Sequence, residues 1–78
     1  MNKLTLKEYN AERIVYLYFP EDEGEAGEIV YDTATKEATV VTRASKDRYG
    51  KYGHNALRKV KEYINEDYLP IHAYQAWN

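Results

Sequence analysis

The sequence predicts an α+β domain in which one amphipathic helix covers one face of a small antiparallel sheet, in the order β-β-β-β-α-β. Three observations support this fold class. Apolar residues recur at helical spacing between His54 and Glu66, residues 13–19 are rich in β-branched and aromatic side chains, and two short strand-like segments flank residues 32–37. The 78 residues form one domain, residues 1–78. A chain of this size buries only about 60% of the surface that it exposes when unfolded, so the core must be dense or be completed by a partner.

The first segment, Lys3–Tyr9, is compatible with two structures. Residues 5–8 have the composition of a capping box that would open a helical turn, whereas the whole segment can form an edge strand that turns at residues 10–12. We favour the edge strand because the next segment needs a neighbour. That segment, Arg13–Phe19, is apolar on both faces and ends at Pro20, which predicts the central strand of the sheet.

A hairpin is predicted after the central strand. Residues 20–28 form a loop, because they combine glycines with a high density of acidic side chains. Ile29–Tyr31 and Ala38–Arg43 have strand composition, and residues 32–37 between them have turn composition. The two short strands should therefore pair.

The helix is expected to follow a polar connection at residues 45–53. Asn55 is a good N-cap residue, and Pro70 ends the helical pattern because it disfavours helical geometry in the residue before it. After Pro70, residues 71–77 are expected to form a last strand or an extended tail that packs over the sheet with Trp77 docked. One face of the helix should be buried, and its apolar residues are Ala56, Leu57, Val60, Tyr63 and Ile64.

Nine tyrosines supply most of the aromatic content. Tyrosine can bury a large ring while its hydroxyl stays in water, which suits a thin core close to solvent. The chain has no cysteine, which excludes disulfides and thiolate metal sites and fits a reducing compartment. The longest apolar run is about a third of the roughly 20 residues that a membrane-spanning helix needs, so we expect a cytoplasmic protein with no membrane partner.

Most kinds of chemical site are disfavoured by the sequence. Neither His54 nor His72 has a second ligand within one or two helical turns, so no metal site is expected. The acidic loop of residues 21–25 lacks the alternating ligands of a calcium-binding loop and is expected to be a solvated turn. No hydrolase elbow surrounds Ser45, and no phosphate-binding glycine motif joins a strand to the helix. We therefore expect no enzymatic activity and no cofactor.

Charge is segregated along the chain, although the net charge is only −2. Seven acids and one lysine lie between Glu21 and Glu37, whereas seven basic residues and one aspartate lie between Arg43 and Lys61. Tyr49 and Tyr52 interleave with the basic residues, which is compatible with phosphate contact and base stacking. Residues 50–53 also have the glycine spacing of the backbone-clamping loop of KH domains. The alternative is that the basic half neutralises the acidic half, within the monomer or across a dimer.

Four short motifs are notable along the chain: Tyr-Phe-Pro-Glu at 18–21, Gly-Glu-Ile-Val-Tyr-Asp at 27–32, His-Asn-Ala-Leu-Arg-Lys-Val at 54–60 and Ala-Trp at 76–77. In these motifs the chain resembles an uncharacterised family of small Firmicutes proteins that are encoded by chromosomes and mobile elements. The resemblance extends over most of the chain from Val15 onward, and it implies a small bacterial cytoplasmic protein of unknown function. It brings no activity, ligand or catalytic residue.

Two functional hypotheses follow from these observations. The first is a protein-interaction module, acting on a protein partner or on a second copy as a homodimer. The second is a nucleic-acid-binding accessory protein that uses the segment from Arg43 to Lys61. A third, in which the acidic stretch mimics DNA, ranks below both. We favour the first, because a dedicated nucleic-acid-binding domain is more often basic. The candidate interaction surface comprises Glu21, Asp22, Glu23, Glu25, Arg48, Tyr49, Lys51, Tyr52 and Trp77.

Overall fold

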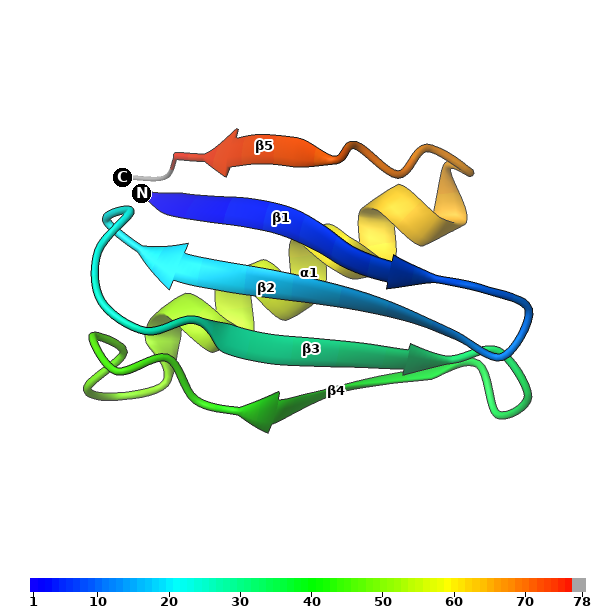
Figure 1. Ribbon diagram of the computed structural model, residues 1–78, viewed down its shortest axis with the longest axis horizontal. Coiled ribbons are helices and arrows are strands. Elements are labelled where there is room, and N and C mark those ends of the chain that lie inside the picture. Colours follow the sequence, from blue (N-terminus) through cyan, green and yellow to red (C-terminus); the bar gives the residue numbers. More distant parts are fainter. Residues whose placement is uncertain (77–78) are drawn as a thin grey trace.

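The computed structural model describes residues 1–76 and confirms the predicted fold class. Figure 1 shows a five-stranded sheet with a single helix on one face. All neighbouring strands are antiparallel, and their order across the sheet is β4-β3-β2-β1-β5. The elements are β1 (Asn2–Tyr9), β2 (Arg13–Pro20), β3 (Gly27–Asp32), β4 (Glu37–Thr42), α1 (Lys51–Asn65) and β5 (His72–Gln75).

The first segment is a strand, as favoured, but it is not an edge of the sheet. β5 pairs with the outer side of β1, from Asn2 opposite Gln75 to Thr5 opposite His72. The side chain of Asn2 is fully buried, and its Nδ2 donates to Gln75 Oε1 at 3.2 Å and to the carbonyl oxygen of Tyr52 at 3.0 Å. The C-terminal segment is therefore a strand held by both backbone pairing and a buried polar network.

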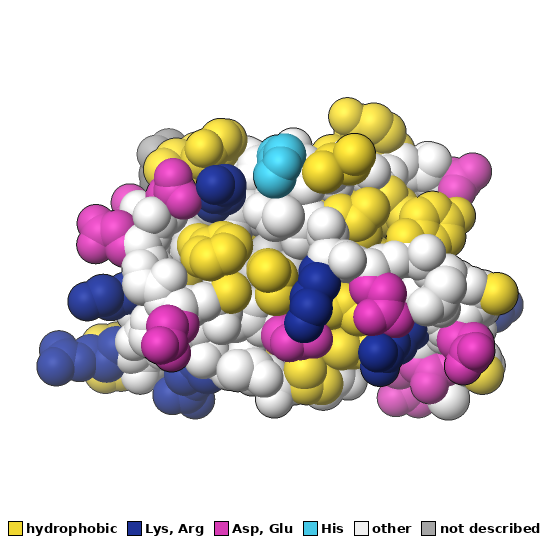
Figure 2. Space-filling view, viewed as in Figure 1, with side chains coloured by type: hydrophobic (Ala, Val, Ile, Leu, Met, Phe, Trp, Pro, Cys, Tyr) yellow, Lys and Arg dark blue, Asp and Glu magenta, His cyan; other side chains and the backbone are white. Residues whose placement is uncertain are grey.

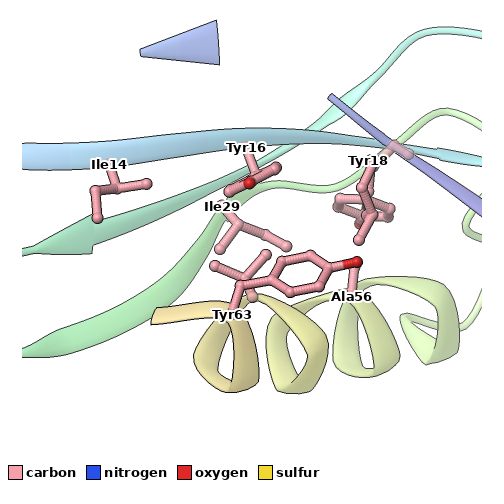
Figure 3. Close-up of a cluster of buried hydrophobic side chains, with 9 residues drawn as sticks. Ile14, Tyr16, Tyr18, Ile29, Ala56 and Tyr63 are labelled. Atoms are coloured by element: carbon pink, nitrogen blue, oxygen red, sulfur yellow. Dashed lines mark hydrogen bonds between the residues drawn. The ribbon is translucent and has the colours of Figure 1, made fainter. Parts of the chain in front are cut away.

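The central position of β2 is confirmed, because β1 and β3 flank it. Its alternate residues Ile14, Tyr16 and Tyr18 point toward the helix, where they meet Leu4 from β1 and Ile29 from β3 (Figure 3). Each of these five side chains is buried. The core is thus a single layer between the sheet and α1.

Two tyrosines depart from the expectation of wet hydroxyl groups. Tyr16 and Tyr18 have no exposed surface, and both of their hydroxyl groups form hydrogen bonds inside the protein. Tyr16 donates to the carbonyl oxygen of Pro70 at 2.6 Å, and Tyr18 donates to Oδ2 of Asp47 at 2.8 Å. Burial raises the pKa of Tyr18 to about 12. The connections on either side of α1 therefore supply the partners that water was expected to supply.

The helix begins at Lys51 rather than at the predicted His54, and Asn55 does not cap it. Gly50 precedes it with φ of 78°, and the first-turn amides of Tyr52 and Gly53 donate to the Asp47 carboxylate at 3.2 and 2.9 Å. Asn55 instead lies buried within the helix, where its carbonyl oxygen accepts from Gln75 Nε2. Asp47, which lies before Gly50, thus caps the helix in place of Asn55, and α1 begins one turn earlier than predicted.

The predicted apolar face of α1 is buried along its middle and only half-buried along the margin next to β4. Ala56, Val60 and Tyr63 are buried against the sheet. Leu57 and Ile64 are half-buried at the margin of the core, and each lines a hollow that α1 shares with β4. Among residues 1–76, no helix has the length and apolarity needed to cross a membrane.

The face of the sheet opposite α1 carries no second layer in the described part of the chain. Figure 2 views this face and shows hydrophobic side chains interrupted by Lys, Arg and acidic groups. Lys7 on β1 reaches across β2 to Glu28 on β3, at 3.5 Å between Nζ and Oε1. Lys3 lies 5.9 Å from the ring centre of Phe19 and also pairs with Asp22. Long charged side chains thus shield part of the apolar surface.

Candidate interaction site

The acidic loop between β2 and β3 is anchored rather than freely solvated. Glu21 pairs with the N-terminal ammonium group at 2.6 Å and accepts a hydrogen bond from the Tyr52 hydroxyl at 2.8 Å. These two hydrogen bonds lower the pKa of Glu21, and the bond to Glu21 raises the pKa of Tyr52. Glu21, Asp22 and Gly24 all have positive φ, so the loop is tightly turned. Glu23 and Glu25 are exposed.

The basic residues from the connection between β4 and α1 are exposed at one end of the molecule. Arg48 stacks 5.9 Å from the ring centre of Tyr49, whose side chain is 84% exposed. Arg43 donates to the carbonyl oxygen of Arg48 at 3.4 Å, and Lys51 is exposed at the start of α1. In Figure 2, Lys and Arg side chains gather over this connection, at the lower left.

The two charged segments are separate in the sequence but adjacent in the structure. The backbone amide of Ser45 donates to the carbonyl oxygen of Glu25 at 3.0 Å, and the amide of Glu25 donates to Ser45 Oγ at 2.7 Å. An anion that approached Arg48 or Lys51 would therefore also meet the acidic loop. The ion pairs of Glu21 and Asp22 run to the N-terminus and Lys3, so these carboxylates are not matched to the basic segment.

Eight of the nine predicted surface residues lie within the described chain, on two neighbouring segments. Tyr52 is half-buried and tethers the acidic loop to α1 through Glu21. Arg48, Tyr49 and Lys51 cluster on the neighbouring connection, and Trp77 lies outside the described residues. Gly50–Gly53 forms the N-cap and first turn of α1 after a connection from a strand, so it does not join two helices as a KH loop does.

A groove lies between β4 and α1, and the sequence did not predict it. Its volume is about 520 Å³. Alternate residues Ala38 and Val40 form one wall, because their side chains face α1 rather than the open side of the sheet. His54 and Leu57, one helical turn apart, form the opposite wall, and Arg43 lies at the end near the start of the helix.

A second hollow of about 200 Å³ continues past Ala38 toward the other end of α1. Ile64 and Tyr31 provide its apolar surface, while Lys36 and Lys61 flank it. Both hollows share Ala38, so together they follow the length of β4. The sequence predicted a strand at Ala38–Arg43 and a helix face that includes Leu57 and Ile64. Only the packing of the helix against the sheet brings these residues together as the walls of the two hollows.

The groove combines apolar and polar lining with cationic side chains at both ends. Asp47 is the one acidic residue among those lining the two hollows, and its carboxylate already accepts hydrogen bonds from Tyr18, Tyr52 and Gly53. No group of three or more potential metal-ligating side chains occurs among residues 1–76.

No family of known proteins, no curated protein and no solved structure matches this chain.

Proposed function

We propose that this chain is a non-enzymatic protein-interaction module that binds a segment of another protein in the groove between β4 and α1. One observation carries this proposal: a groove with a mixed polar and apolar lining runs beside the outer edge of a strand that has no further neighbour in the described part of the chain. A sheet edge beside a helix is a recurrent place for peptide recognition, since the edge offers backbone hydrogen bonds and the groove accepts side chains.

The position of the groove refines the expectation drawn from the sequence. The predicted surface residues within residues 1–76 lie on the loop between β2 and β3, on the connection between β4 and α1 and in the first turn of α1. The groove extends along β4 from Arg43 to Lys36. A homodimer remains a form of the same proposal, in which the bound segment comes from a second copy. The cytoplasmic location and the resemblance to small Firmicutes proteins remain predictions.

Filling the groove is expected to abolish binding of peptides selected on the native protein. A displayed library of random peptides would be selected on the immobilised chain, and the recovered sequences would be titrated by fluorescence anisotropy. Ala38→Phe places a ring at the junction of the two hollows, so affinity should fall by about tenfold or more, the equivalent of about 1.4 kcal/mol.

Thr42→Phe is the matched control for this variant, because Thr42 is exposed on the same strand and lines neither hollow. Its affinity should stay within about threefold of the native value. Selected peptides that bind both variants equally would contradict the assignment of the groove, and so would a selection that recovers no binder.

Nucleic acid is the second candidate partner, favoured by the exposed pair of Arg48 and Tyr49. We expect no binding of single-stranded or duplex DNA or RNA at physiological salt, because the acidic loop adjoins the basic connection. Electrophoretic mobility and anisotropy titrations would test this expectation. Micromolar affinity that falls log-linearly with salt, and that the double variant Arg48→Glu/Lys51→Glu weakens, would establish the alternative instead.

A further inference from the structure

The edge of β4 is regular over the part that borders the groove. Residues 37–40 pair one-to-one with residues 29–32 of β3. The register shifts only beyond Val40, where Val41 has no partner residue. Proteins usually protect an exposed edge with a proline, an inward-pointing charge, a bulge or a very short strand. Here the bulge lies at one end, the sequence Glu-Ala-Thr-Val of residues 37–40 contains no proline, and its one charged residue is Glu37 at the first position. This part of β4 is therefore able to accept another strand.

The two hollows lie one after the other along β4. Successive side chains of a strand point to opposite faces, so every second residue of an added strand would enter the groove. The hollows share Ala38 as a lining residue, and Leu57 and Ile64 provide an apolar surface in each of them. Apolar side chains on one face of an added strand would therefore meet an apolar surface in both hollows.

The ends of the groove select for negative charge. Arg43 lies at one end, and Lys36 and Lys61 lie at the other. The lining carboxylate of Asp47 is 1% exposed and is already engaged by three donors, so no free acid opposes these cations within the groove. His54, exposed in the middle, adds no negative charge.

We propose that the groove binds an extended acidic segment of a partner protein, which joins the sheet as a sixth strand beside β4. The segment carries apolar residues at alternate positions in its centre and acidic residues at both ends. This inference rests on the proposed function and specifies the conformation and the charge of the bound segment. Charge complementarity identifies the occupant, because its acids face Arg43 at one end and Lys36 and Lys61 at the other.

The chain itself is a poorer occupant. Its acidic loop is turned by three residues with positive φ and cannot extend without losing the anchors of Glu21. Antiparallel pairing of β4 with β4 of a second copy would place the Arg43 end of one groove beside the Lys36 and Lys61 end of the other. Like charges would then line the interface.

The probe is a synthetic peptide of about ten residues that alternates valine and threonine and ends in two glutamates on each side. Its affinity would be measured by isothermal titration at about 0.15 M ionic strength. Two matched peptides would be tested beside it, one with lysines in place of the glutamates and one with a central proline. Because proline removes a ladder hydrogen bond, and lysine meets like charge, each should bind at least about tenfold more weakly.

Charge reversal on the protein supplies the second arm. Arg43→Glu/Lys61→Glu should weaken the glutamate peptide by about tenfold or more and should strengthen the lysine peptide. Arg48→Glu/Lys51→Glu makes the same change in net charge outside the groove. Its affinity for the glutamate peptide should therefore remain within about threefold of the native value. Hydrogen exchange should show new protection of outward-pointing β4 amides when the glutamate peptide binds.

The possible failures separate the inference from the proposed function. Binding of the selected peptides could be blocked by Ala38→Phe and yet be independent of peptide charge, or give the β4 amides no protection from hydrogen exchange. Either result would overturn the inference of an acidic added strand and leave the groove as the binding site. A native mass that is dimeric by sedimentation and becomes monomeric in Ala38→Phe would show that a second copy occupies the groove. Two results together would overturn both the inference and the proposed function. They are that the three peptides bind equally well or not at all, and that the selected peptides bind Ala38→Phe as well as the native protein.

Discussion

Asp47→Ala is expected to lower the free energy of unfolding by about 2–5 kcal/mol. The side chain is buried and accepts three hydrogen bonds, from the Tyr18 hydroxyl and the amides of Tyr52 and Gly53. Alanine would remove the cap of α1 and leave a buried hydroxyl without its acceptor. Each buried donor left without a partner costs about 1–3 kcal/mol.

The measurement is equilibrium unfolding in urea, followed by circular dichroism. A matched control is Asp32→Ala, because Asp32 Oδ1 also accepts two backbone amides, from Ala34 and Thr35, but in an exposed turn. Water can replace those acceptors, so the control should cost less than about 1 kcal/mol. Equal midpoints for the two variants would show that Asp47 does not hold the helix to the sheet.

Gly27→Ala is expected to cost about 3 kcal/mol or more, through overpacking. A methyl group at this position would lie 2.1 Å from Cε1 of Tyr18 and 2.7 Å from the backbone nitrogen of Ala44. The ring cannot move aside, because its hydroxyl donates to Asp47 and accepts from the amide of Ala44. The first residue of β3 would therefore have to leave its register.

Gly50→Ala is the comparison for this substitution. Gly50 has a positive φ of 78°, but the nearest atom to an added methyl group is Arg43 Nη2 at 3.8 Å. Only the backbone conformation is penalised, at about 1–2 kcal/mol. Thermal or urea denaturation should therefore rank Gly27→Ala below Gly50→Ala in stability, and the reverse order would contradict the close contact with Tyr18.

Local pattern was enough to predict four strands and the helix from the sequence. Arg13–Phe19 reads as a central strand because both of its faces are apolar, and β2 is central in the sheet. The edge assignment of β1 failed because the pairing partner of Asn2 is Gln75, at the far end of the chain. Periodicity describes one segment at a time and does not specify such a distant neighbour.

The candidate site was harder to predict for the same physical reason. In the sequence, Asp47 is one charged residue in a polar connection. Its structural role depends on the hydroxyl of Tyr18, which comes from the distant strand β2. The groove depends on the angle at which α1 crosses β4, which neither segment encodes alone. Charge segregation was visible in the sequence, but the contact between Glu25 and Ser45 brings the acidic and basic segments to the same end of the molecule.

The pairing of β1 with β5 has a consequence for the order of folding. The contacts from β1 to β4 join strands that follow one another in the sequence, so their loops are short and can close early. β5 closes a loop of nearly the whole chain, so we expect it to pair last, after α1 has docked. Until then β1 is an open edge and the amide of Asn2 lacks Gln75 as a partner. If β5 is not paired in the transition state, its contacts should affect the unfolding rate more than the folding rate.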